Sequence, residues 1–142
     1  METNRVLIVD DEEGVRKLLG RILEAAHMDV YAAPDGKTAL ALASSCKPAL
    51  VILDMGLPDM DGGEVLRRIK SQETTRDVPV MILTGMLDVP AGACGLENGA
   101  DAFMLKPFLS GEMMARVNAL LYHGPGPHAP ARQDAQVAGG AP

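Results

Sequence analysis

The sequence predicts an α/β domain in which a parallel sheet carries helices on both faces. Short apolar segments without polar alternation recur along the chain, and amphipathic or alanine-rich segments separate them. Continuous apolar runs are typical of strands that are covered on both faces. Strands of this kind that alternate with helices form parallel sheets with short, right-handed connections. The length of 142 residues, with 47% hydrophobic and 23% charged residues, fits a single globular domain.

Five strands are expected, at residues 6–9 (VLIV), 30–32 (VYA), 49–53 (ALVIL), 78–83 (VPVMIL) and 102–105 (AFML). The second strand is the weakest of the five because its segment is short and not strongly apolar. Pro79 has no backbone N–H to donate to a sheet, so we expect it at the start of the fourth strand.

Helices are expected between the strands, at residues 12–26, 37–45, 63–71 and 111–122. In the first helix the apolar residues follow helical spacing and form one stripe: Val15, Leu18, Leu19, Ile22 and Leu23. The second helix follows a turn at residues 34–36, and Ser110 is a candidate N-cap for the last helix. One proline and three glycines at residues 88–99 disfavour a regular helix, so we expect any helix there to be short or mobile.

Composition and charge exclude several classes of function. The net charge of −6 is a poor match for a polyanion, and no expected helix is strongly basic, so we expect no direct contact with nucleic acid. Cys46 and Cys94 do not form a C-x-x-C pair, which makes reduced thiols the default. No apolar run approaches the roughly 18 residues of a membrane span, and no signal peptide is evident. These features predict a soluble, cytoplasmic protein that does not enter the membrane.

One folded domain is expected over residues 1–122. Most of residues 123–142 are Pro, Gly or Ala, and such a segment cannot bury enough apolar surface to offset the entropy lost on ordering. We therefore expect a disordered tail or a linker there. The composition leaves open whether the chain stands alone or is part of a longer protein.

Polar side chains follow four of the five expected strands. Asp10 and Asp11 come after the first strand, Asp54 after the third, Thr84 after the fourth and Lys106 after the fifth. Chemistry in an open parallel sheet collects at the carboxyl ends of its strands. Each residue alone has an ordinary explanation, such as a helix cap, a turn or a surface charge. The combination of acids, a hydroxyl and an amine at several strand ends indicates a site.

The three acids call for a positive partner because carboxylates that lie close together repel one another. Mg²⁺ prefers oxygen ligands and suits a site with few carboxylates, and Lys106 adds a second positive group. The charges of three carboxylates, one Mg²⁺ and one ammonium then sum to zero. A site of this kind suits phosphoryl transfer, and an aspartate is a sound acceptor because it can form an aspartyl phosphate.

On four segments the chain resembles the receiver domain of bacterial two-component response regulators: VLIVDDEE, ILDMGLPDMDG, MILTG and GADAFMLKPF. The resemblance covers about residues 5–122 and is specific because all four segments occur together. It implies a flavodoxin-like fold, a doubly wound sheet of five parallel strands in the order 2-1-3-4-5. It also implies a signalling module that is not an enzyme beyond its own phosphoryl transfer and dephosphorylation.

The resemblance implies a role for each polar residue at the strand ends. Asp54 is expected to accept a phosphoryl group from a phosphohistidine on a sensor histidine kinase or a phosphotransfer protein. Asp11 is expected to bind Mg²⁺ directly and Asp10 largely through water. The acceptor Asp54 and the backbone carbonyl of Gly56 are further metal ligands, and Lys106 is expected to pair with the phosphoryl oxygens.

The same resemblance implies a switch. Thr84 would move to hydrogen-bond the phosphoryl group, and Phe103 matches an aromatic switch position, although a plain core aromatic is a serious alternative. The bond between Lys106 and Pro107 is a candidate cis peptide. The switched surface of the family consists of its fourth helix (residues 88–99 here), its fifth strand (residues 102–105) and its fifth helix (residues 111–122). It is expected to contact a downstream protein effector, and a phosphorylation-dependent homodimer through it stays open.

Two other functions compete with this interpretation. A pseudo-receiver would bind its partner without phosphorylation, but the complete set of polar residues argues against that class. An enzyme or nucleotide binder of similar fold would need a phosphate loop, and no G-x-x-x-x-G-K-[ST] or G-x-G-x-x-G motif follows a strand. Gly56 and Met86 flank the expected site without a side-chain acid or amide, so we expect no dedicated help with dephosphorylation from them.

Overall fold

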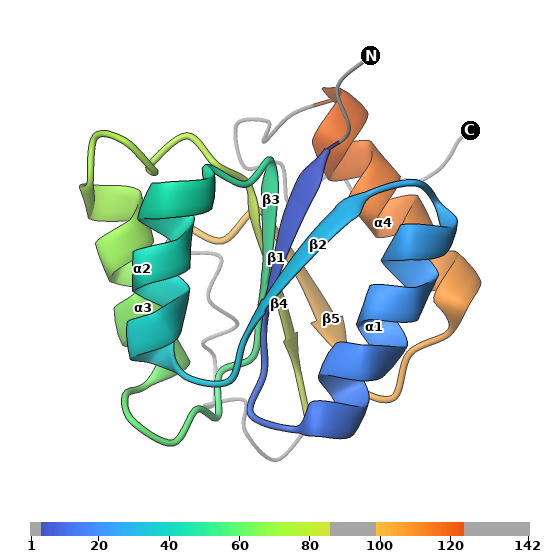
Figure 1. The fold of residues 1–142 in the computed structure, drawn as a ribbon, viewed down its shortest axis with the longest axis horizontal. Coiled ribbons are helices and arrows are strands. Elements are labelled where there is room, and N and C mark those ends of the chain that lie inside the picture. Colours follow the sequence, from blue (N-terminus) through green and yellow to red (C-terminus); the bar gives the residue numbers. More distant parts are fainter. Residues whose placement is uncertain (1–3, 86–98, 124–142) are drawn as a thin grey trace.

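The computed structural model describes residues 4–85 and 99–123, which form a three-layer α/β domain (Figure 1). Its sheet consists of β1 (Arg5–Val9), β2 (Asp29–Ala33), β3 (Leu50–Leu53), β4 (Val80–Thr84) and β5 (Ala102–Leu105). All neighbouring strands are parallel, in the order β2-β1-β3-β4-β5. The predicted fold class and strand order are confirmed.

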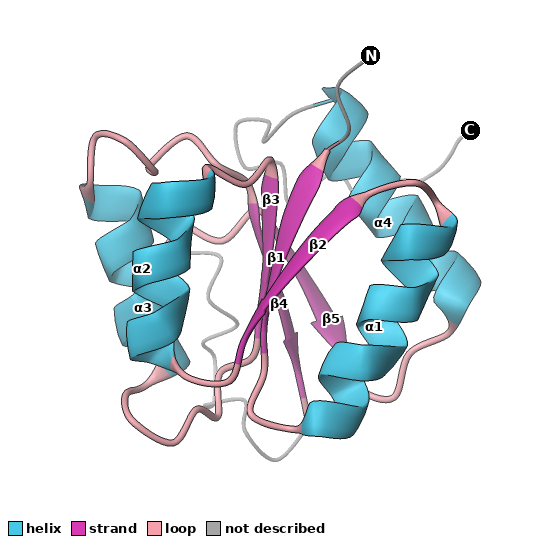
Figure 2. Ribbon diagram, viewed as in Figure 1, coloured by secondary structure: helices cyan, strands magenta, loops and turns pink. Residues whose placement is uncertain are grey.

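Four helices lie within the described ranges: α1 (Glu13–Ala25), α2 (Gly36–Cys46), α3 (Gly62–Ser71) and α4 (Ser110–His123). Figure 2 shows α1 and α4 on one side of the sheet and α2 and α3 on the other, as predicted for helices on both faces. The helix expected at residues 88–99 and the tail expected at residues 123–142 fall almost entirely outside the described residues. No helix in the described part of the chain is long and apolar enough to cross a membrane.

Each face of the sheet has its own apolar core, which explains why the central strands carry apolar residues on both faces. Val6 and Ile8 of β1 lie in the core with α1 and α4, whereas Leu7 and Val9 lie in the core with α2 and α3. The edge strand β2 is largely exposed, and only Ala33 is fully buried there. The central strands therefore read as strong apolar runs and β2 as a weak one.

Three helices differ in detail from the sequence predictions. Leu18 belongs to the apolar stripe predicted for α1 but is 49% exposed, because α1 rests on the sheet through Leu19 and Leu23. Ser110 is the first residue of α4 rather than its cap, and the carbonyl of Leu109 accepts from the N–H of Met113. The turn at residues 34–36 runs directly into α2, which begins at Gly36 rather than at residue 37.

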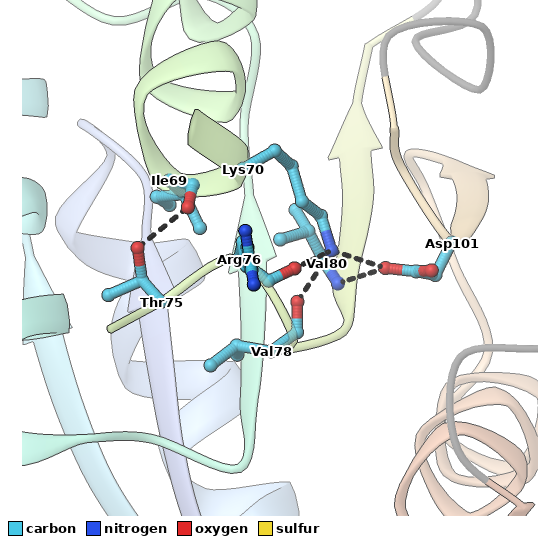
Figure 3. Close-up of polar contacts among 7 residues, drawn as sticks. All are labelled: Ile69, Lys70, Thr75, Arg76, Val78, Val80 and Asp101. Carbon is cyan, nitrogen blue, oxygen red and sulfur yellow. Dashed lines mark hydrogen bonds and ion pairs between the residues drawn. The ribbon is translucent and has the colours of Figure 1, made fainter. Parts of the chain in front are cut away.

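A group of polar contacts closes the amino-terminal ends of β4 and β5 (Figure 3). Lys70 reaches from α3 and donates through Nζ to the carbonyls of Val78 and Arg76, at 2.7 and 3.3 Å. It also pairs with Asp101 Oδ2 at 3.1 Å, and that oxygen accepts from the N–H of Val80 at 2.9 Å. These contacts join α3 to the start of both strands, at the opposite end of the sheet from the predicted site.

Candidate metal and phosphoryl site

The register of the central strands places the predicted acids at one edge of the sheet. Val9 of β1 pairs with Leu53 of β3, and the next residues along each strand are Asp10 and Asp54. The ladder continues beyond the strands, because the N–H of Asp54 donates to the carbonyl of Val9 at 2.9 Å. Asp10 and Asp54 therefore leave the sheet side by side.

Asp10, Asp11 and Asp54 form an acidic cluster. One carboxylate oxygen from each of them lies within 4.8 Å of the corresponding oxygens of the other two. The side chains of Asp10 and Asp54 are buried and that of Asp11 is exposed, so the cluster opens to solvent on the side of Asp11. An all-oxygen ligand set with this spacing fits a hard divalent cation such as Mg²⁺.

Lys106 supplies the positive charge next to the cluster. Its Nζ lies 2.8 Å from Asp10 Oδ2, 3.4 Å from Glu12 Oε1 and 3.6 Å from Asp54 Oδ2. Burial by itself lowers the pKa of Lys106, but the carboxylates of Asp10, Asp54 and Glu12 together raise it above its usual value. Lys106 is therefore a fixed cation at neutral pH.

The pKa of Asp10 is raised above its ordinary value. Burial is the main influence that raises the pKa of this carboxyl group, and the nearby charge of Asp54 adds to the rise. The hydrogen bonds from Lys106 and from the N–H of Glu12 act in the opposite direction. Glu12, not an aspartate, occupies the N-cap position of α1, and no side chain caps that helix.

Two buried oxygens near this edge have no hydrogen-bond partner among the described residues: Asp54 Oδ1 and Thr84 Oγ1. Leaving a buried polar atom unpaired costs about 1–3 kcal/mol, so such atoms are rare unless a bound group completes them. Thr84 ends β4, and its carbonyl accepts from the N–H of Lys106 at 2.9 Å. The unpaired hydroxyl thus belongs to a strand end whose backbone neighbours that of Lys106. Both orphaned atoms fit a site that binds a metal and a phosphoryl group.

A close backbone approach shapes the loop that carries Gly56. The N–H of Gly62 donates to the carbonyl of Met55 at 3.0 Å. A Cβ atom at Gly62 would lie 2.5 Å from Met55 Cα and 2.7 Å from the carbonyl oxygen of Asp54. Only glycine allows α3 to start this close to the predicted acceptor.

The remaining predicted residues are not members of the acidic cluster. Phe103 is partly buried against the core that contains α2 and α3, and its carbonyl accepts from Arg116 at 3.0 Å. The peptide bond between Lys106 and Pro107 is cis. Gly56 is exposed in the loop after Asp54, and Met86 lies outside the described residues.

The sequence interpretation missed three residues that shape this edge. Glu12 is a second acidic partner of Lys106, and Arg16 donates to the carbonyl of Asp10 at 2.8 Å. Asp59 binds two N–H groups at the start of α2, more than twenty residues away. Glu12 and Arg16 could have been found from their places beside the acidic pair, but no local pattern indicates the partners of Asp59.

Comparison with known proteins agrees with this geometry. A family model described as the response regulator receiver domain matches residues 6–118. The DNA-binding dual master transcriptional regulator RpaA of Synechocystis sp. is 42% identical over 117 residues, which are 82% of this chain and 48% of that protein. The alkaline phosphatase synthesis transcriptional regulatory protein PhoP of Bacillus subtilis has the same identity and coverage. The chain spans about half the length of these curated relatives.

Solved structures give the same result for the fold. A response regulator from Chloroflexus aurantiacus is similar with a TM-score of 0.80 and 32% identity, over 85% of this chain and 99% of that one. The chemotaxis protein CheY4 of Vibrio cholerae is similar with a TM-score of 0.78 and 27% identity, over 84% of this chain and 100% of that one. The match thus extends over nearly the whole length of both solved chains.

Proposed function

The chain belongs to the family of response regulator receiver domains, and from that premise we propose that Asp54 accepts a phosphoryl group and thereby switches a protein-interaction surface. One observation carries the assignment to Asp54. This side chain is buried, its Oδ1 atom has no partner among the described residues, and its Oδ2 atom lies 3.6 Å from the ammonium of Lys106. The carboxylate of Asp54 therefore combines an unpaired oxygen with a nearby positive charge.

The acidic cluster is the proposed place for Mg²⁺, with Asp10, Asp11 and Asp54 as carboxylate ligands and the carbonyl of Gly56 as a further ligand. The close spacing of the three carboxylates and the unpaired Oδ1 of Asp54 support this set. When bound, the cation supplies positive charge against the carboxylates and the oxygens of the incoming phosphoryl group.

In the proposed reaction a carboxylate oxygen of Asp54 attacks the phosphorus of a phosphohistidine on a sensor kinase or phosphotransfer protein. A P–O bond forms, the P–N bond breaks, and the imidazole leaves with its electron pair. Lys106 holds a phosphoryl oxygen, since its ammonium already lies between Asp10 and Asp54. The residues of this chain act mainly by position and by charge, which is what phosphoryl transfer requires.

Thr84 and Phe103 are the proposed switch residues. The hydroxyl of Thr84 is unpaired among the described residues, so a new phosphoryl oxygen would give it an acceptor. A shift of β4 toward the phosphoryl group would favour one of two arrangements of the surface near Phe103. A downstream protein effector that prefers this arrangement would read the phosphorylated state.

Nucleic-acid contact, dimerisation and location of the chain are untouched by the geometry of the site. The absence of direct nucleic-acid contact stays a prediction from the net charge, and the description "DNA-binding" belongs to a relative of which the chain spans about half. Phosphorylation-dependent dimerisation and a cytoplasmic location also stay predictions. Gly56 has no side chain that could assist dephosphorylation, so Gly56→Asn is expected to change the rate of dephosphorylation. Loss of label from the phosphorylated protein would measure this rate.

Intact-mass spectrometry after incubation with acetyl phosphate and Mg²⁺ tests the function. We expect one added phosphate on the wild-type chain and none on Asp54→Asn. Asp61→Asn is the matched control, because Asp61 is an acid of the same loop that caps α3 through the N–H of Gly63. This control should still be labelled. Absence of label on the wild type would overturn the proposal and favour a pseudo-receiver.

A further inference from the structure

The loop after the proposed acceptor is fastened to a helix that follows a different strand. Asp59, in the loop between β3 and α3, accepts hydrogen bonds from the N–H groups of Gly36 and Lys37 at 2.8 and 2.9 Å. Both N–H groups belong to the first turn of α2. The carboxylate of Asp59 therefore joins the loop that carries Gly56 to the start of α2.

This contact completes the cap of α2, which has a second, separate part. The N–H groups that precede the first helical hydrogen bond have no partner inside the helix. Asp35, the N-cap residue, accepts from the N–H of Thr38 at 2.8 Å through its own side chain. Asp59 accepts hydrogen bonds from the other two N–H groups of the turn, those of Gly36 and Lys37. Local and distant carboxylates thus share one helix end, and only the distant one contacts the loop.

Packing reinforces the hydrogen bonds. A Cβ atom at Gly36 would lie 2.5 Å from Met60 Cγ and 2.9 Å from Val65 Cγ2, so the loop and α3 press against the bare backbone of α2. The N–H groups of Gly36 and Lys37 also hold the pKa of Asp59 below its ordinary value. Asp59 is consequently a charged acceptor at neutral pH.

The contact fixes one end of a very short span. At the other end, the carbonyl of Met55 accepts from the N–H of Gly62 at 3.0 Å. Only Gly56, Leu57 and Pro58 lie between these two fixed points, and proline restricts the backbone further. The position of the Gly56 carbonyl therefore depends on both attachments.

We propose that Asp59 is a positioning residue for the metal site: by holding the loop on α2, it keeps the carbonyl of Gly56 in place to bind the cation. This inference rests on the proposed function, which makes that carbonyl a ligand. Partners of metal ligands outside the coordination sphere commonly set both ligand orientation and metal affinity.

The test compares Asp59→Ala with Asp35→Ala, because each variant removes part of the same helix cap but only the first detaches the loop. Mg²⁺ is titrated into each ¹⁵N-labelled protein, and the Kd is read from amide chemical shifts. We expect Asp59→Ala to raise the Kd about tenfold, the lower end of the range for such partners. Asp35→Ala should stay within about twofold of the wild type. Asp59→Asn, which keeps one acceptor oxygen, should be intermediate and rescue part of the affinity.

Acetyl phosphate labelling separates positioning from loss of structure. Detaching the loop should raise the Mg²⁺ concentration that gives half-maximal labelling, and saturating Mg²⁺ should restore most of the rate. An unchanged Kd in Asp59→Ala, or an equal rise in Asp35→Ala, would overturn the inference while leaving the proposed function intact. A wild-type chain that takes up no phosphate would instead contradict the proposed function.

A measurement on the wild type alone keeps the inference testable if Asp59→Ala does not fold. Coupling between two sites is reciprocal, so a cation that needs the attached loop must also stabilise the attachment. Mg²⁺ should then slow hydrogen exchange of the Gly36 and Lys37 amides more than that of Thr38. Equal protection of all three amides would contradict the role of Asp59.

Discussion

At the scale of single residues, Gly62 shows how a missing side chain shapes the acidic site. We expect Gly62→Ala to lower the free energy of unfolding by about 1–3 kcal/mol, because the new Cβ overlaps the backbone of Asp54 and Met55. The displaced backbone should also weaken Mg²⁺ binding. Urea unfolding and a Mg²⁺ titration measure the two effects. Gly14→Ala is the control, since nothing lies within 4 Å of a Cβ there and α1 should gain stability. Equal effects of the two variants would contradict this account.

We expect Lys106 to promote phosphorylation and to weaken the binding of Mg²⁺. Its ammonium lies 2.8 Å from Asp10 and 3.6 Å from Asp54, so it partly neutralises the carboxylates that would bind a cation. Lys106→Met should therefore bind Mg²⁺ more tightly at neutral pH and yet label more slowly with acetyl phosphate. Lys17→Met, which removes an exposed lysine of α1, should change neither quantity. Weaker Mg²⁺ binding in Lys106→Met would be inconsistent with this division of roles.

At the scale of elements, the cap of α2 should respond to pH through Asp59. The pKa of this carboxyl group is lowered in the fold by the N–H groups of Gly36 and Lys37, from an ordinary value of 3.8. Its contribution to stability is thus fully present above pH 3.8 and is lost as the pH falls through the lower pKa of the folded state. The urea midpoint of the wild type should exceed that of Asp59→Asn at neutral pH. This difference should shrink in strong acid, and a difference that grew instead would contradict the charge of Asp59 as the cause.

The contacts of Lys70 join three elements, and their loss should destabilise the whole domain. The side chains of Lys70 and Asp101 are only 18% and 8% exposed. Removing the lysine therefore leaves a buried carboxylate whose remaining hydrogen-bond donor among the described residues is the N–H of Val80. We expect Lys70→Met to lower the free energy of unfolding by about 3 kcal/mol. Lys17→Met breaks an exposed pair with Glu13 and should change it by less than about 0.5 kcal/mol. Similar urea midpoints for the two variants would refute the structural role of Lys70.

The same elements show what could be predicted from sequence. The central strands were predictable because both of their faces are buried, so β1 and β3 each differ from their predicted residues by only one. The acids of the cluster and Lys106 were predictable because each follows a strand within two residues. Asp59 and Asp101 were not, because their partners lie more than twenty residues away and no local pattern marks them. The start of α2 at Gly36 was missed for the same reason, since a distant carboxylate supports it.

At the scale of the whole molecule, the two ends of the sheet have opposite character. At the amino-terminal end, Lys70 and Asp101 form an ion pair, and Lys70 also donates a hydrogen bond to a nearby backbone carbonyl (Figure 3). At the carboxyl end, three acids lie together and two buried oxygens have no partner among the described residues. Natural proteins commonly accept local strain of this kind at functional sites while the rest of the fold supplies stability. A ligand that relieves the strain should therefore stabilise the entire domain.

Mg²⁺ should consequently raise the melting temperature of the wild-type chain. A cation at ten times its Kd stabilises the folded state by about 1.4 kcal/mol if it does not bind the unfolded chain. Asp11→Asn should abolish this gain with little effect on the metal-free protein, because the side chain of Asp11 is exposed and lies at the open side of the cluster. Glu73→Gln, at an exposed acid after α3, should keep the full gain. Thermal unfolding with and without Mg²⁺ measures the difference, and an equal gain in wild type and Asp11→Asn would mean that the cation acts elsewhere than at the cluster.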